Sequence, residues 1–498
     1  MNISQAKDYI KHSIQIYLKK DEFGDYRIPV VRQRPLFLLG APGIGKTAIM
    51  EQIAQEMGVA LVSYSMTHHT RQSALGLPFI KQKEYGGKTY DVSEYTMSEI
   101  IASIYDTMEE SGVTEGILFL DEINCVSETL APSMLQFLQY KVFGKHKVPE
   151  GWVIVTAGNP PEYNKSVREF DVVTMDRLKV LEVEADYATW KIYAKEKGIH
   201  TAIMNFLELK KEYFYHMETT VKGRSYVTAR GWEDLSQVMQ MYEEDGILAD
   251  EDLFAQYLQN EKIVKAFGAY YDLYNKYKKD YQVERLLGGA IEERVIEKAR
   301  AASFDERLSL LGMLLDTVQF EMKEVVEMSA FLSEMMPALK AVKTADSVYE
   351  MLDIQANARD TIMKNLQKAN ALSSGDRKKH KRIYAFLTET KKEILANELD
   401  DGEVAFSYIK EKFDAKVSEM KELVAKTTQR IHYLFAFVHA AFEEGNEMLV
   451  LVTELTVNRY SSTFISTFGC EDYQKYNEIL MVSKRQEDLR GQIAELLL

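Results

Sequence analysis

The chain has 498 residues, more than one hydrophobic core usually serves, so we expect two or three domains. Hydrophobic residues make up 46% of it and charged residues 28%, which excludes a disordered or fibrous protein. The 76 acidic residues outnumber the 61 basic ones, and the resulting net charge of -15 disfavours a protein that coats nucleic acid.

Cysteine content and hydropathy predict a soluble, cytoplasmic protein with no membrane segment. Cys125 and Cys470 are the only cysteines, too few for a disulfide framework or a thiolate zinc site, which suits a reducing compartment. Residues 1–20 carry charges among their apolar positions and lack the core of a signal peptide. The most apolar later stretch, residues 431–442, is shorter than the ~20 residues that a spanning helix needs.

The first part of the chain alternates strand and helix patterns, as a parallel sheet with crossover helices requires. Apolar runs predict buried strands at residues 36–39, 60–64, 116–120, 152–157 and 179–183. Helical patterns predict helices at residues 4–20, 46–57, 97–109 and 128–139. We also expect a hairpin over residues 79–92, with its turn at Gly86-Gly87.

The rest of the chain is predicted to be helical. Eight of the nine prolines precede residue 162, so long helices are expected after it. Residues 186–245 predict three short helices, the last at residues 229–242. Amphipathic patterns predict longer helices at residues 307–336, 346–371, 377–397 and 404–444.

A glycine-rich segment follows the first predicted strand and fits the pattern G-x-x-x-x-G-K-[ST]. Its residues are Gly40, Ala41, Pro42, Gly43, Ile44, Gly45, Lys46 and Thr47, with Ala48 next in the following helix. Glycines let backbone N–H groups converge on phosphate oxygens, and the helix N-terminus adds its positive dipole end. Lys46 is expected to reach the β- and γ-phosphates of ATP, and the Thr47 hydroxyl to bind Mg²⁺.

Two acidic residues, Asp121 and Glu122, end a buried strand about 75 residues downstream. Asp121 is expected to hold Mg²⁺, directly or through water, and Glu122 to act as the general base for the attacking water. Asn159, at the end of another core strand, could position that water. Arg177 and Arg230 are further candidates, since a guanidinium suits developing phosphoryl charge.

Taken together, these motifs resemble the AAA+ ATPases of the MoxR type. The likeness rests on residues 35–47, the run Asp121-Glu122-Ile123-Asn124, the strand ending Asn159-Pro160, Met175-Asp176-Arg177, and the segment from Arg71 to Pro78. The helical patterns after residue 245 predict an all-α C-terminal domain (246–498), and the resemblance implies an α/β P-loop core (1–185) and a helical lid (186–245). It also implies a ring, usually a hexamer, with ATP bound between subunits.

The resemblance assigns roles to single residues. Arg177 matches the arginine finger that reaches the neighbouring subunit's ATP, with Arg168 as an alternative. Asn159 matches the sensor of the attacking water, and Arg230 the lid's second sensor. The chain departs from the family at Cys125-Val126-Ser127-Glu128, where a basic residue and prolines are common, and at Leu178, where Phe is usual.

We therefore expect an ATP-hydrolysing, Mg²⁺-dependent motor that remodels or matures a protein partner. For the MoxR type this partner is commonly a von Willebrand factor A-domain protein. Two alternatives stay open: a motor acting on nucleic acid, and a scaffold that uses ATP only to set the shape of a ring. The basic run at residues 377–382 is expected to be a solvated helix face, and His68-His69 with Arg71 a loop near the nucleotide or a subunit boundary.

Overall fold

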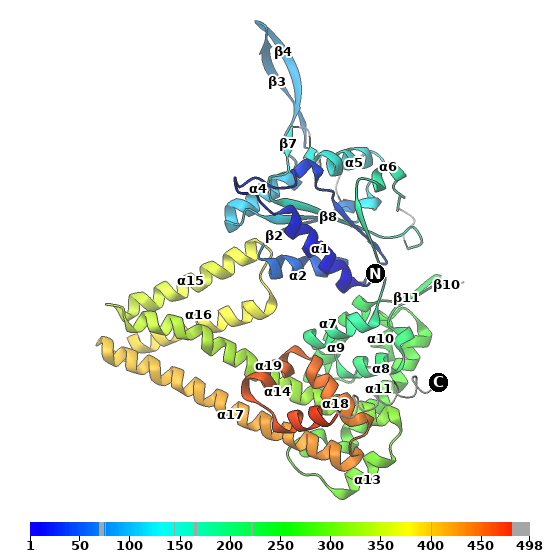
Figure 1. Ribbon diagram of the computed structural model, residues 1–498, viewed down its shortest axis with the longest axis vertical. Helices are drawn as coiled ribbons and strands as arrows, with labels where there is room; N and C mark the ends of the chain where they lie inside the picture. The colour runs from blue at the N-terminus through cyan, green and yellow to red at the C-terminus, as the bar shows by residue number, and fades with distance from the viewer. Residues whose placement is uncertain are drawn as a thin grey trace, which may run out of the picture. The chain divides into compact units, whose positions relative to one another are not determined.

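A computed structural model describes residues 1–68, 74, 76–143, 145–163, 167–220, 223–399 and 401–480 (Figure 1). These residues divide into two compact units. The first comprises Met1–Thr189 and Ala356–Tyr384, and the second comprises Trp190–Gln355 and the described residues from Ala385 onward. The expected lid therefore groups with later helices, and a helical segment from the C-terminal half groups with the α/β core. These boundaries differ from the predicted 1–185, 186–245 and 246–498.

A five-stranded parallel sheet lies at the centre of the first unit, in the order β2-β5-β8-β1-β9. Its strands are β1 (Leu36–Gly40), β2 (Ala60–Ser65), β5 (Gly116–Asp121), β8 (Trp152–Gly158) and β9 (Lys179–Val183). All five predicted strands are confirmed, and β8 is buried along its whole length. Because β8 pairs in parallel with both β1 and β5, its carboxyl end lies between theirs. The P-loop, the acidic pair and Asn159 follow these three strands, so they meet at one edge of the sheet.

The α/β part of the first unit carries several helices, only some of which begin at a side-chain cap. They are α1 (Ile3–Tyr17), α2 (Lys46–Met57), α4 (Glu99–Ser111), α5 (Ala131–Tyr140) and the short α6 (Val172–Met175). Ser98 caps α4 by accepting from the Ile101 N–H, so α4 begins two residues later than predicted. The predicted helix at 128–139 begins only at Ala131, with Pro132 in its first turn, where the missing N–H costs no hydrogen bond.

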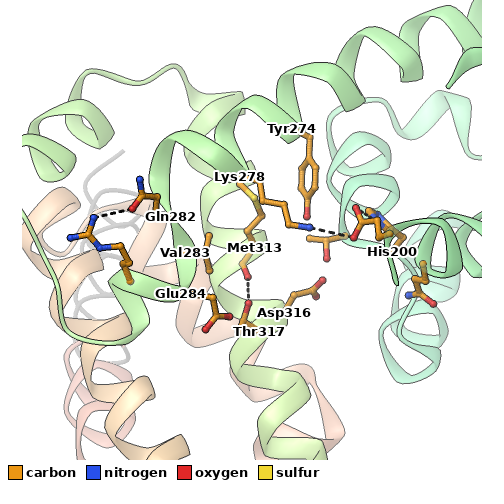
Figure 2. Close-up of a pocket in the computed structure, with 13 residues that line it drawn as sticks. His200, Tyr274, Lys278, Gln282, Val283, Glu284, Met313, Asp316 and Thr317 are labelled. Atoms are coloured by element: carbon orange, nitrogen blue, oxygen red, sulfur yellow. Dashed lines mark hydrogen bonds and ion pairs between the residues drawn. The ribbon is translucent and has the colours of Figure 1, made fainter. Parts of the chain in front are cut away.

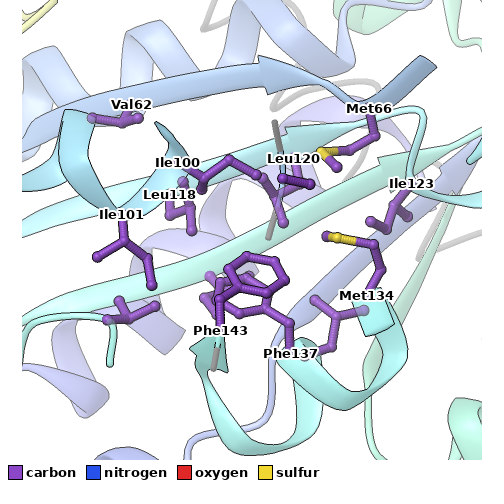
Figure 3. Packing of buried hydrophobic residues seen from close by; sticks show 14 of the residues in the cluster. Val62, Met66, Ile100, Ile101, Leu118, Leu120, Ile123, Met134, Phe137 and Phe143 are labelled. Atoms are coloured by element: carbon purple, nitrogen blue, oxygen red, sulfur yellow. The ribbon is translucent and has the colours of Figure 1, made fainter. Parts of the chain in front are cut away.

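One face of the sheet packs into a hydrophobic core, shown in Figure 3. Residues from β2, β5, α4 and α5 contribute to this core, among them Val62, Leu118, Ile101 and Phe137. Phe137 stacks on Phe143 with ring centroids 3.9 Å apart. This packing holds β2 and β5 in place beneath the edge of the sheet that carries the candidate site.

A long hairpin projects from the first unit (Figure 1). It consists of β3 (Pro78–Tyr85) and β4 (Lys88–Tyr95), joined at Gly86 and Gly87 as predicted. Both glycines have positive φ, 59° and 78°, which a two-residue turn of this kind requires. Three large hydrophobic side chains of the hairpin are at least half exposed, namely Ile80, Tyr85 and Tyr90. At its base, Glu94 pairs with Lys83 and Lys145, and hydrogen bonds from these lysines lower the pKa of Glu94 to about 2.

The remaining chain is dominated by helices, which confirms the predicted all-α region. The helices are α7 (Tyr187–Lys197), α8 (Thr201–Leu209), α9 (Ala229–Glu244), α10 (Glu251–Tyr257), α11 (Glu261–Tyr281), α12 (Val283–Leu287), α13 (Glu293–Ala301), α14 (Phe304–Lys343), α15 (Val348–Lys368), α16 (Ser374–Ala396), α17 (Gly402–Phe442), α18 (Asn446–Val457) and α19 (Arg459–Phe468). A hairpin of β10 (His216–Thr220) and β11 (Gly223–Val227) was not predicted. Within the part of the chain that the structure describes, no helix combines the length and apolar content needed to cross a bilayer.

The second unit contains a pocket of about 400 Å³ between α8, α9, α11, α12 and α14 (Figure 2). Glu243 accepts hydrogen bonds from His200 and Lys278 there, and these lower its pKa to about 2. Asp316 also lines this pocket, where desolvation by the surrounding protein raises the pKa of its carboxyl to about 7, although its side chain keeps contact with solvent. The charges of Lys195 and Lys278 oppose this increase only in part.

Candidate nucleotide-binding site

The P-loop connects β1 to α2, and its glycines are required by the backbone. Gly43 and Gly45 have φ of 74° and 96°, in the region that side chains rarely adopt. A Cβ atom on Gly40 would lie 2.5 Å from the Val183 carbonyl oxygen. Gly45 is the N-cap residue of α2 and has no side chain to cap its N–H groups. These N–H groups are thus oriented as an anion site requires.

Lys46 is buried, with 8% of its surface exposed. Its Nζ donates to the carbonyl oxygens of Gly40 and Ala41, at 2.7 and 2.8 Å, and to Oδ1 of Asn159 at 2.9 Å. The ammonium group is therefore fixed at the base of the loop, against the side chain predicted to sense the attacking water. The structure brings these two predicted residues together.

Thr47 and Asp121 also meet, as predicted for the Mg²⁺ ligands. The Thr47 hydroxyl donates to Oδ2 of Asp121 across 2.8 Å. A hydroxyl and a carboxylate are the oxygen ligands that Mg²⁺ prefers. The described residues contain no group of three His, Cys, Asp or Glu able to hold a metal. The pair suits Mg²⁺, which usually takes one or two protein oxygens and completes its shell with phosphate and water.

Glu122 follows β5 and has a left-handed backbone, with φ 55° and ψ 35°. This backbone is sparsely populated for residues other than glycine, asparagine and aspartate, and such residues often mark functional sites. The hydroxyls of Ser65 and Thr67 both donate to its Oε2 atom at 3.0 Å. The candidate general base is therefore held by two side chains at the end of β2.

Ser65 and Thr67 were missed by the sequence analysis. Ser65 ends β2 opposite Asp121 in the parallel register of β2 and β5. Hydroxyl residues are common after a strand, so their pairing with Glu122 became evident only once the strand order was known. Cys125 lies nearby, but burial and then the charges of Glu122 and Asp121 raise the pKa of its thiol. A protonated thiol is a poor nucleophile, which argues against a catalytic role for Cys125.

Asn124 joins the acidic segment to the end of β8. Its Nδ2 donates to the Asn159 carbonyl oxygen at 2.8 Å, and its own carbonyl accepts from the Arg168 N–H at 2.9 Å. Asn124 is buried, and a Cβ on Gly158 would lie 2.5 Å from its Oδ1. Position 158 therefore has room only for glycine beside this side chain.

The three candidate arginines all have exposed side chains. Arg168 pairs with Glu128. Arg177 follows α6, near Asp171, whose pKa is lowered mainly by hydrogen bonds to Thr174 and also by the charge of Arg177. Arg177 also borders a pocket of about 320 Å³ beside α5. An exposed side chain suits a residue that reaches a neighbouring subunit. Both candidates for the arginine finger, Arg168 and Arg177, are exposed.

Arg230 lies in the first turn of α9, in the second unit, so its role as a phosphate sensor stays a prediction. The Arg71–Pro78 segment is described only in part. His69 and Arg71 themselves lie outside the described residues.

Residues 36–175 match the family model described as "ATPase family associated with various cellular activities (AAA)". The match begins at β1, includes the P-loop, the acidic pair and Asn159, and ends with α6, before Arg177. No curated protein matches the chain. Nucleotide binding and ATP hydrolysis are the general activity of the matched family. The α/β core of this chain is therefore an AAA domain of the AAA+ ATPase superfamily.

Proposed function

We propose that this protein is a Mg²⁺-dependent AAA+ motor that forms a ring and uses ATP hydrolysis to remodel a protein partner. The observation that carries the proposal is the convergence of Lys46, Thr47, Asp121, Glu122 and Asn159 at one edge of the sheet. Each of these side chains has a separate task in phosphoryl transfer, and their arrangement matches those tasks.

Binding is assigned to the P-loop. The N–H groups at the start of α2 hold phosphate oxygens, and Lys46 neutralises part of their charge. Thr47 and Asp121 would hold Mg²⁺, which offsets charge on the phosphates when it is bound. In this structure Lys46 donates to Asn159, so a phosphate that engages Lys46 competes with that hydrogen bond.

Hydrolysis is assigned to Glu122 and Asn159. Glu122 takes the proton of the attacking water, and Asn159 orients that water. Glu122 must first leave the hydroxyls of Ser65 and Thr67. An arginine of a neighbouring subunit, Arg177 or else Arg168, would stabilise the charge that develops on the transferring phosphoryl group.

Protein remodelling is proposed from the resemblance to the MoxR type and from the projecting hairpin. Its exposed Ile80, Tyr85 and Tyr90 offer apolar and aromatic contacts of the kind that bind protein chains. By the same resemblance, a von Willebrand factor A-domain protein is the partner class to test first. The net charge of -15 keeps a nucleic-acid motor as the less favoured alternative.

The test uses a variant that binds ATP without hydrolysing it and therefore stays bound to its partner. Glu122→Gln, loaded with Mg-ATP, should sediment as a larger ring species and retain a von Willebrand factor A-domain protein from the same host. Lys46→Ala is the matched control, because it removes nucleotide binding at the same site. Equal recovery of the partner with both variants, or no change in sedimentation with ATP, would contradict the proposal.

A further inference from the structure

A turn from the C-terminal half of the chain is hydrogen-bonded to β2, an outermost strand of the parallel sheet. Residues 369–371 connect α15 to α16 and belong to the first unit together with β2. The Leu61 N–H donates to the Ala369 carbonyl at 3.0 Å, and Nδ2 of Asn370 donates to the Leu61 carbonyl at 3.1 Å. Both main-chain groups of one residue in an edge strand are thereby satisfied.

The contact is packed as well as hydrogen-bonded. Ala369 is 1% exposed and belongs to the same hydrophobic core as Val62 of β2. Lys368 lies 3.6 Å from the carboxylate of Glu110 on α4, a weak ion pair at the rim. Asn370 has φ 52°, a left-handed backbone that asparagine tolerates better than most residues. The turn is thus shaped to present its amide to β2.

The same strand holds the general base at its other end. Four residues beyond Leu61, Ser65 donates to Glu122, and Thr67 donates to the same oxygen. β2 is paired with β5 in one continuous register from Ala60 to Ser65. Its hydrogen bonds to β5 make β2 a rigid element, so a restraint at Leu61 also limits movement of Ser65.

We propose that Asn370 is a positioning residue for ATP hydrolysis: the 369–371 turn clamps β2, and β2 restrains Glu122 through Ser65 and Thr67. This inference rests on the proposed ATPase function and adds its regulation. Because α15 and α16 continue from the turn into the second unit, a partner that bends these helices would alter the clamp and thereby the turnover rate. In this way the helices of the second half of the chain could change the rate of ATP hydrolysis without contacting ATP.

The test compares Asn370→Ala with the exposed control Asn365→Ala on α15. Loss of the clamp should speed hydrogen exchange at the Leu61 amide and raise basal kcat about fivefold, the size expected for one hydrogen bond. The affinity for ATP should stay within about twofold, because no P-loop contact changes. Asn370→Gly, which keeps the left-handed backbone without the amide, should behave in the same way.

A double variant separates positioning from a general loss of structure. In a Ser65→Ala/Thr67→Val background, Glu122 is already released, so Asn370→Ala should leave kcat unchanged. Faster exchange at Leu61 with unchanged kcat in the wild-type background would overturn the inference, as would an undiminished effect in the double-variant background. If the wild-type protein itself did not hydrolyse ATP, the proposed function would fail instead, and the two failures are distinguishable.

Discussion

The Nζ atom of Lys46 lies 2.9 Å from Oδ1 of Asn159, joining the P-loop to the end of β8. Since β1 and β8 are neighbouring strands, the hydrogen bond spans adjacent strand ends. A phosphate bound by Lys46 competes for this contact and leaves Asn159 able to engage the attacking water. If Asn159 has the proposed sensor role, this hydrogen bond couples nucleotide binding to the release of its side chain.

Asn159→Ala should separate binding from turnover. We expect kcat to fall roughly 10- to 100-fold, because the positioning of water is lost. The affinity for ATP should change by less than about threefold, because the lost hydrogen bond from Lys46 is one that bound phosphate displaces in any case. Equilibrium binding of a fluorescent ATP analogue and steady-state phosphate release measure the two quantities. Asn397→Ala, an exposed position outside the site, is the control. A large loss of affinity with unchanged kcat would instead make Asn159 a binding residue.

Gly158→Ala should destabilise the first unit. The new methyl group would meet Oδ1 of Asn124 at 2.5 Å and push this side chain away from the Asn159 carbonyl. Overpacking of this kind costs roughly 1–3 kcal/mol, to be measured by chemical denaturation. Gly375→Ala, where nothing but the Ser373 hydroxyl lies within 4 Å, should be nearly neutral. If the two variants had the same free energy of unfolding, Asn124 would be able to move away from β8 without destabilising the protein, which would contradict this prediction.

Much of the fold was predictable because it depends on local patterns. Continuous apolar runs identify the five buried strands, and two adjacent glycines identify the turn between β3 and β4. Helix starts were less accurate, since the Ser98 side chain caps α4 and Pro132 lies in the first turn of α5, and neither detail follows from hydrophobic periodicity. The hairpin of β10 and β11 was missed within a segment whose pattern favoured helices.

The site was predictable where a motif specifies it and not where strand order does. The P-loop and the acidic pair are recognisable from the spacing of their residues, and the structure brings Lys46 next to Asn159 and Thr47 next to Asp121. The restraint of Glu122 by Ser65 and Thr67 depends on β2 lying beside β5. The contact of Asn370 with Leu61 joins residues more than 300 positions apart, and no local pattern indicates such a pair.

Mixing two inactive variants tests whether each ATP site is built from residues of two neighbouring subunits. Arg177→Ala keeps an intact P-loop, whereas Lys46→Ala keeps an intact finger, so a mixed ring contains some interfaces with both. We expect each variant alone to lose at least about 100-fold in turnover and their mixture to regain part of it. The same mixture with Arg168→Ala determines which arginine acts. Failure of both mixtures at every ratio would argue against a finger supplied in trans.

Asp316→Asn should stabilise the second unit at high pH and not at low pH. The folded-state pKa of about 7 lies above the ordinary 3.8, so the folded protein binds more protons than the unfolded chain between these values. The contribution of the Asp316 carboxyl to the free energy of unfolding is therefore fully present below about pH 4. It is lost as the pH rises through 7 and the carboxyl ionises. We expect a gain of about 1 kcal/mol at pH 8, limited because the pocket admits water that screens the charge.

Thermal unfolding of the wild type and Asp316→Asn across pH 4–8 measures this difference. Lys195 is present in both proteins, but burial lowers its pKa to about 7, so its charge also falls near the upper end of this range. Asp346→Asn, at an exposed position after α14, serves as the control and should show no such trend. A gain that does not depend on pH would assign the effect to packing and not to titration of Asp316.

The most direct test of the account is phosphate release from Mg-ATP by the wild type and by Glu122→Gln, with nucleotide binding measured on the same samples. If Glu122 is the general base of an AAA ATPase, the variant should bind ATP as the wild type does while turnover falls by roughly two to four orders of magnitude. Unchanged turnover in Glu122→Gln, or no binding of millimolar Mg-ATP by the wild type, would contradict the account.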